Sequence, residues 1–431
     1  MKKYRKLFAP LVVAVWTFTL SQPVLAAPME LSLDDAVALA LKNNSDIKIA
    51  SFDREKSLWA ITQAEAGKGF ALTYSHSDER YNTPPSSLTG YKYVWTTKFD
   101  NEFAVSLPVY SGRKLESLID QAQLNFKIAD LNVDATRQQL RQTVTTDYFT
   151  VLQYRNALAI STETVDNYAS HLKNVQAQFD VGIVAKSDVL ASEVSLANAQ
   201  DGLIKSENNY QLAVATLNNA VGLPLSSDIK LKEDLKYEKY APTLDACAGY
   251  ALANRPEIAE YQAKIAVAHD DVKIAKSGYL PTVSFAAAED WYDKELPGTK
   301  NNNWLVSLTA SLDLFDSGLT QAKVRQAQFG VATAEEQFRQ KRDAILLEVR
   351  QYYLSMREAE KRIDTSTVAV DQAVENLRIA ELRYTAGVGT NLDVLDAVLS
   401  LNQAKTNYVQ ALYDYNTSKT ELDKAMGVAV K

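Results

Sequence analysis

The chain has 431 residues but only one cysteine and three histidines. Cys247 has no partner for an intrachain disulfide, and so few thiol and imidazole ligands argue against a metal site of the zinc type. No metal or other cofactor is expected. Ala36 occupies the position equivalent to Cys247 in an internal repeat described below, which favours a buried small apolar residue. His76, His171 and His269 are isolated in the sequence, and we expect them to be ordinary surface or half-buried residues.

Helix-breaking residues are missing from long stretches of the chain. No proline lies between Pro108 and Pro224 or after Pro297, and residues 113–181 contain neither glycine nor proline. A continuous helix over that stretch would be roughly 100 Å long. We therefore expect one very long helix, or an end-to-end pair, followed by a tight turn and a returning helix. The other stretches of this kind, with at most one glycine each, are 183–221, 319–386 and 390–426.

Motifs of enzyme chemistry are also missing. The sequence contains no Gly-x-Ser-x-Gly elbow, no phosphate-binding loop and no metal-ligand spacing, so we do not expect an enzyme. The formal net charge is −7. Nucleic acid is not expected as a partner, because its phosphates bind basic surfaces.

The N-terminus is typical of a secretory signal peptide. Four basic residues lie within residues 2–6, residues 7–20 are mostly apolar, and Val24-Leu25-Ala26 fits a small-residue cleavage site. We expect residues 1–26 to be removed. The alternative is an uncleaved membrane anchor, for which the apolar run is short.

What the sequence does contain is a duplication of nearly its whole length. The offset is 205 residues (384 − 179) in the C-terminal part of each copy, where Phe179-x-x-Gly182-x5-Asp188 returns as Tyr384-x-x-Gly387-x5-Asp393. Upstream, residues 43–47 match 254–258 at an offset of 211, which predicts a longer loop in the first copy. Repeats this long imply two whole structural units. We divide the mature chain into a first repeat (27–223), a linker (224–242) and a second repeat (243–431).

Each copy also predicts a β-hairpin. Apolar residues at even positions from Trp304 to Leu314 alternate with mostly polar ones, which is the period of a strand with one apolar face. Residues 103–109 show the same pattern, and that strand should end near Pro108, which cannot donate to a ladder. Partner strands are expected near 70–76 and 281–288. Three tryptophans in the hairpins suit a membrane interface: Trp95, Trp291 and Trp304.

Four strands in one chain imply an oligomer if they lie in a membrane. A strand in lipid cannot leave its edge unpaired, and known bacterial membrane barrels have at least about eight strands. One chain cannot close such a barrel, whereas two or three copies can. The periodicity does not decide between these numbers.

Taken together, these features resemble the TolC-like outer membrane efflux protein family. The matching segments are Phe179–Leu190, Tyr384–Ala397, Asn254–Ile258 and Gly222–Pro224. The resemblance implies a mixed α and β fold, mostly α, in which two tandem repeats each contribute a β-hairpin to a shared outer-membrane β-barrel. Their long coiled-coil helices would contribute to a shared periplasmic α-barrel.

The resemblance also implies a function and partners. It implies a homotrimer in the outer membrane, spanning into the periplasm and serving as a passive exit duct for small molecules or proteins. The duct would belong to a tripartite efflux or type I secretion system and work with a periplasmic adaptor protein and an inner-membrane pump. The alternative left open by the residues alone is a non-transport periplasmic coiled-coil adaptor or tether.

By the same resemblance, functional residues lie at the two hairpin turns. The adaptor would dock on Gly182, Ile183, Val184, Gly387, Val388 and Gly389. The periplasmic gate would comprise Asp188, Tyr384, Asp393 and Asp396. Three copies would surround the axis with carboxylates, which attract cations and, when crowded, raise the pKa of some members. An arginine tie of the family falls on Gly389, so that restraint is missing. The residues alone also allow Asp188 and Asp393 to serve only the start of the returning helix.

Overall fold

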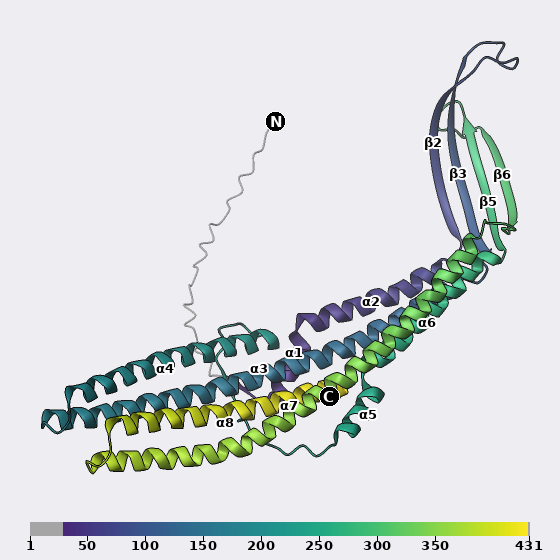
Figure 1. Cartoon of the computed structure of the whole chain (residues 1–431). Helices are drawn as coiled ribbons and strands as arrows, with labels where there is room; N and C mark the ends of the chain where they lie inside the picture. Colours follow the sequence, from purple (N-terminus) through teal and green to yellow (C-terminus); the bar gives the residue numbers. More distant parts are fainter. Residues whose placement is uncertain (1–28, 430–431) are drawn as a thin grey trace, which may run out of the picture.

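The computed structural model describes residues 29–429. The predicted signal peptide, residues 1–26, lies outside this part of the chain. Figure 1 shows an elongated molecule with a β-sheet at one end and long helices that finish in two turns at the other. The expected mixed fold, mostly α, is confirmed. Within residues 29–429, no helix combines the length and the apolar composition needed to cross a bilayer.

The elements occur in the same order in both repeats. The first repeat comprises β1 (Met29–Leu31), α1 (Leu33–Asn43), α2 (Ser45–Ala66), β2 (Ala71–Thr83), β3 (Val94–Tyr110), α3 (Lys114–Asp180) and α4 (Lys186–Val221). The second comprises β4 (Ile229–Leu231), α5 (Leu244–Asn254), α6 (Pro256–Lys276), a 3-10 turn (Ser277–Tyr279), β5 (Thr282–Asp293), β6 (Asn301–Ser311), α7 (Leu319–Thr385) and α8 (Asn391–Met426). The starts of α1 and α5 differ by 211 residues, and those of α3 and α7 by 205, as predicted from the sequence.

The long helices are continuous. α3 and α7 each have 67 residues, and α4 and α8 each have 36. Buried residues recur along α3 at the spacing of a helix stripe, for example Val144, Tyr148 and Val151. Each long helix contacts its returning helix, and α3 also contacts α8, so the layer near the turns runs α4–α3–α8–α7. Nearer the sheet the order is α2–α3–α6–α7.

The two β-hairpins form one four-stranded antiparallel sheet in the order β2–β3–β5–β6. The two outer strands differ from the predicted ranges. β2 is longer and extends to Thr83, whereas β6 ends earlier, at Ser311, so Leu312 and Leu314 lie beyond it. β3 continues to Tyr110, two residues past Pro108, and the pairing register with β5 shifts between these two residues. Proline lacks the N–H that regular pairing requires, which explains the irregularity.

A small region beside the middle of the helices joins the two repeats. β1 and β4 pair in parallel, with Leu31 opposite Leu231. Both are buried in the main core, as is Cys247, which confirms that the cysteine is a buried residue. This strand pair was not predicted from the sequence, because three residues are too few to show a period.

Candidate functional site at the tip of the helical hairpins

The two hairpin turns have the same geometry. Gly182 and Gly387 adopt φ values of 77° and 72°, in the left-handed region that favours glycine. At the first turn, the Gly182 N–H donates to the Phe179 carbonyl (2.8 Å) and the Ile183 N–H donates to the Gln178 carbonyl (2.9 Å). This pair of bonds satisfies the last carbonyls of α3 and ends the helix.

The second turn contains an additional glycine for a different reason. The Gly389 N–H donates to the Arg383 carbonyl at 3.0 Å. A Cβ at this position would lie 3.0 Å from the Tyr384 nitrogen and 3.1 Å from the Arg383 carbonyl carbon. Gly389 therefore permits a close approach of the turn to the end of α7. The guanidinium of Arg383 lies beside this turn, with its Nη2 3.5 Å from the Val388 carbonyl oxygen.

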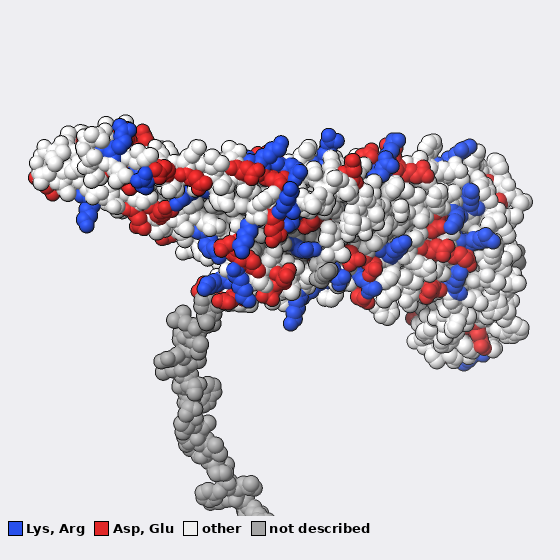
Figure 2. Space-filling model, turned by 90° about the horizontal axis from the view of Figure 1, so that it is seen from below, with Lys and Arg blue, Asp and Glu red and all other residues white. Residues whose placement is uncertain are grey.

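The tip presents apolar side chains to solvent. Val181 and Ile183 in the first turn, and Val388 and Leu392 at the second, are all exposed. In Figure 2 the narrow end of the molecule that carries the turns is mostly uncharged on the face shown. Val184 differs from its neighbours, because it is partly buried against the core beneath the tip.

The acidic residues near the turns have different surroundings. Asp393 forms a capping box with Thr390: its carboxylate accepts from the Thr390 N–H (2.9 Å), and its own N–H donates to the Thr390 hydroxyl (3.1 Å). The Thr390 backbone and hydroxyl, and then Arg383, lower the pKa of Asp393. In the single chain Asp393 is therefore a helix-capping residue. α4 has no side-chain cap, so Asp188 acts on that helix only as a first-turn charge.

Tyr384 is buried in the core of the tip, whereas Asp396 lies on its surface. The Tyr384 side chain is buried, and burial followed by the charge of Asp188 raises its pKa. Within residues 29–429, its hydroxyl has no hydrogen-bond partner. Asp396 is exposed on α8, and its charge adds to burial in raising the pKa of Tyr168. Of the four predicted gate residues, Asp188 and Tyr384 are thus close enough to interact electrostatically.

A buried polar cluster joins the two hairpins just behind these residues. His171 on α3 is only 4% exposed, and its Nε2 lies 2.6 Å from Oδ1 of Asn391, the first residue of α8. The Ser192 hydroxyl of α4 lies within hydrogen-bond distance of the Asp188 carbonyl on its own helix (2.9 Å) and of the same Asn391 oxygen (3.1 Å), and Asn391 Nδ2 donates to the Asp188 carbonyl (3.1 Å). The His171 ring also packs against Tyr384, with centroids 5.0 Å apart.

The expectation that His171 is a surface or half-buried residue was therefore wrong. His171 and Asn391 are 220 positions apart, and no local pattern connects them. The available signal was indirect: residue 171 lies on the same helical stripe as Tyr168 and Val175, which are apolar or aromatic.

The sheet has one apolar and one polar face. The pairing register places Val105 opposite Ala287 and Ala287 opposite Val306, so all three point to one face. Trp95, Trp291 and Trp304 are even numbers of residues from these positions along their strands and lie on that same face. The opposite face carries charged residues: Lys98, Asp100, Glu102 and Asp290.

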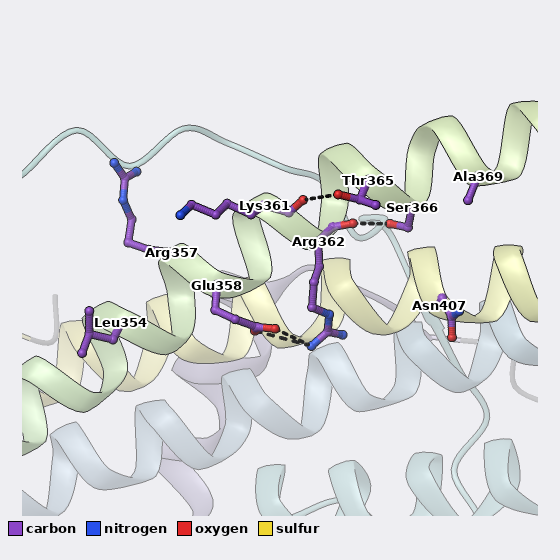
Figure 3. A pocket seen from close by; sticks show the side chains of 9 residues that line it. All are labelled: Leu354, Arg357, Glu358, Lys361, Arg362, Thr365, Ser366, Ala369 and Asn407. Atoms are coloured by element: carbon purple, nitrogen blue, oxygen red, sulfur yellow. Dashed lines mark hydrogen bonds and ion pairs between the residues drawn. The ribbon is translucent and has the colours of Figure 1, made fainter.

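Both edges of the molecule lack a partner among residues 29–429. In the sheet, β2 pairs only with β3 and β6 only with β5. Among the helices, α4 and α7 are the outer members of the layer near the turns. α7 carries a groove of about 830 Å³ that is open to solvent. Figure 3 labels the residues that line it, among them Leu354, Glu358 and Ser366. The whole length of the molecule is therefore an open layer with two free edges.

Comparison with known proteins identifies relatives over most of the chain. Residues 36–223 and 248–428 match the family described as "Outer membrane efflux protein". The chain is 24% identical over 408 residues to the outer membrane protein TolC of Escherichia coli K12, covering 89% of this chain and 80% of that protein. It is 26% identical to the solvent efflux pump outer membrane protein SrpC of Pseudomonas putida, covering 90% and 83%. The solved CmeC outer membrane channel of Campylobacter jejuni has the same fold, with a TM-score of 0.81, 17% identity and coverage of 98% and 94%.

Proposed function

This chain belongs to the outer membrane efflux protein family, and from that premise we propose that three copies of it form a continuous exit duct through the outer membrane and periplasm. The chain is an outer membrane channel of an efflux or secretion system, and it lies in the outer membrane with its helices in the periplasm. Its family is one of transport channels rather than enzymes. The trimer, the adaptor and the inner-membrane pump are the parts of this account that are proposed.

The observation that carries the proposal is the pair of free edges along the whole molecule. A membrane sheet cannot expose unpaired backbone groups to lipid, so β6 of one copy must pair with β2 of the next. Three copies of a four-stranded sheet give twelve strands. The apolar face that contains Val306 and Leu308 would contact lipid, with Trp95, Trp291 and Trp304 at the interfaces, and the charged face would line the water-filled interior.

The internal repeat supplies a template for the contact between copies. Within the chain, α3 contacts α8, and Gln153 donates to Gln410 across that interface (2.7 Å). At the repeat offset of 205 residues, α7 is the equivalent of α3, and α4 is the equivalent of α8. The position equivalent to Gln153 is therefore Glu358, and the position equivalent to Gln410 is Lys205. Both side chains are exposed in the single chain, at 59% and 72%. Their opposite charges support packing of α4 from one copy into the Figure 3 groove on α7 of the next.

The hairpin turns are the proposed docking site of the periplasmic adaptor. Support comes from the exposed apolar side chains at both turns and from their fixed glycine geometry. Contact residues would be Gly182, Ile183, Val184, Gly387, Val388 and Gly389. Asp188, Tyr384, Asp393 and Asp396 would form the gate immediately behind the tip. Gly389, where the family has an arginine, leaves one fewer restraint on closing.

Extraction and conductance measurements test the proposed function together. We expect the protein to leave the membrane only with detergent, to run as a heat-modifiable oligomer on gels, and to conduct ions in planar bilayers. The rival account is a periplasmic adaptor or tether. Release of the protein by osmotic shock without detergent, together with absence of conductance, would support that rival.

The acidic residues of α8 give a separate prediction. Three copies would bring Asp393 and Asp396 around one axis, where their charges favour cations. We expect Asp393→Asn with Asp396→Asn to lower cation preference and block by multivalent cations, while the trimer stays assembled. The reversal potential in planar bilayers under a salt gradient measures the preference.

A matched control removes two carboxylates far from the turns. Asp134 and Asp343 are exposed and pair with Arg137 and Arg342 on their own helices. Their replacement by asparagine should leave the reversal potential unchanged. If the Asp393 and Asp396 variant also kept its full cation preference, the carboxylates would be helix-capping residues and not the filter.

A further inference from the structure

The buried cluster of His171, Ser192 and Asn391 connects the two hairpins through polar side chains at the tip, beside a second hydrogen bond from the Tyr168 hydroxyl to the Leu395 carbonyl (3.3 Å). His171 and Ser192 belong to α3 and α4, the hairpin of the first repeat, whereas Asn391 begins α8 of the second. Asn391 Nδ2 also binds the backbone of Asp188, so a single side chain holds both helices of the first hairpin. Separation of the hairpins would break the hydrogen bonds of Asn391 to His171 and to the Asp188 carbonyl, whereas the Ser192 hydroxyl would keep its hydrogen bond to the Asp188 carbonyl on its own helix (2.9 Å).

The hydrogen bonds fix the protonation of His171. Asn391 Nδ2 donates to a carbonyl, so its Oδ1 faces His171 and Ser192 as an acceptor. His171 Nε2 must then carry the hydrogen, and in the neutral ring Nδ1 carries none. A second proton would place a positive charge in a site where the direct partner is a neutral amide.

The surroundings of His171 compensate that charge only in part. From α7, the aromatic ring of Tyr384 packs on the imidazole and Glu381 acts on it through space. From α8 the contact is the neutral Asn391, and from α4 the nearest charged residue of the cluster is Asp188, which contributes its backbone carbonyl. Burial lowers the pKa of His171, and the Asn391 hydrogen bond and the charge of Glu381 offset this only in part.

We propose that Asn391, His171 and Ser192 form an acid-labile latch, in which neutral His171 holds the second hairpin against the first and protonated His171 releases it. Asn391 is the positioning residue of this latch. The inference rests on the proposed function, because it assigns a regulatory role to the tip of the duct.

The direction of the pH effect follows from the burial of His171. When the hairpins separate, the ring becomes solvated and its pKa returns toward 6.5. The separated state therefore binds more protons, and the latched state loses stability as the pH falls below about 6.5. Above that pH the latch is at full strength. The ratio of open to closed tips should rise about tenfold per pH unit for each histidine until the latched form is itself protonated.

Distances between the two turns test the latch directly. Spin labels at Val181→Cys and Val388→Cys, both at exposed positions, report the separation of the hairpins in detergent-extracted protein. The background carries Cys247→Ala, which is conservative because the equivalent residue is Ala36. With labelled copies diluted among unlabelled ones, so that each proposed trimer carries a single labelled pair, we expect one short distance at pH 7.5 and a longer, broader distribution at pH 5.5.

Two substitutions separate the latch from other acid effects. His171→Gln keeps an N–H donor toward Asn391 but does not titrate, so its distances should stay short at both pH values. Asn391→Ala removes the connection, and its distances should be long even at pH 7.5. His269→Gln, at an exposed position on α6, is the control and should respond like the unmodified protein.

The outcomes distinguish the latch from the duct. An unchanged distance in the unmodified protein at pH 5.5, or a full acid response in His171→Gln, would overturn the latch. Conductance recorded on the same samples should rise with the distance change at pH 5.5. If the distances changed as expected in a protein that conducts nothing, the latch would stand and the proposed duct would fail.

Discussion

Val306→Arg and Leu308→Arg are each expected to prevent assembly of the protein in the outer membrane. Both residues lie on the apolar face of the edge strand β6. An arginine on the lipid face costs about 2–4 kcal/mol near the middle of the bilayer. Every copy in the oligomer carries the substitution, so a trimer would bear this cost three times. The measurement is the fraction of the protein recovered as oligomer in detergent extracts of outer membranes.

Ser307→Arg provides the matched control on the same strand. Ser307 lies between the two test residues and points to the opposite, polar face of the sheet. The same new side chain should be tolerated there because it would face water. Equal assembly of Val306→Arg and Ser307→Arg would show that the apolar face does not contact lipid.

Gly387→Pro is expected to abolish export while leaving the assembled channel in the membrane. Proline requires φ near −65°, whereas Gly387 adopts 72°. Proline also lacks the N–H that donates to the Tyr384 carbonyl at 3.0 Å. The turn would therefore rearrange, and the proposed docking surface with it. The sheet lies at the other end of the molecule, so its assembly should be unaffected (Figure 1).

Retention of a fluorescent efflux dye measures this effect in cells that lack their own copy of the gene. Gly387→Ala is the graded control: alanine keeps the N–H and accepts positive φ at a cost of about 1–2 kcal/mol, so export should fall only in part. Gly182→Pro should act like Gly387→Pro. Normal export by both proline variants would show that the turns are not part of the docking site.

The fold was predictable where one physical signal dominated a long stretch. The absence of glycine and proline from residues 113–181 predicted α3, and the duplication predicted α7 with the same length. The alternation around Val306 predicted β6. The strand ends were less accurate, because Leu312 and Leu314 continue the alternation beyond the residues that pair with β5.

The tip was predictable only in part. Gly182 and Gly387 could be assigned to turns, since each interrupts a helical pattern, and their positive φ values confirm this role. The latch was not predictable, because His171 and Asn391 meet only after two long helices have packed. The sequence predicted that one chain could not close a barrel, but which strands and helices lie at the free edges required the structure, since their order is a property of the folded layer.

A cross-link between copies tests the central claim most directly. With Cys247 replaced by alanine, cysteines at Glu358 and Lys205 should react across the contact of α7 with α4 of the next copy when a short bismaleimide is added to whole membranes. Glu336 lies 22 residues from Glu358 on the same helix, about 33 Å away, and its pairing with Lys205 is the control. The account predicts covalent dimers and trimers, with nothing larger, for Glu358→Cys with Lys205→Cys and neither for the control. The account would be contradicted if only monomers were recovered, if the largest covalent product were a dimer, or if products larger than a trimer appeared.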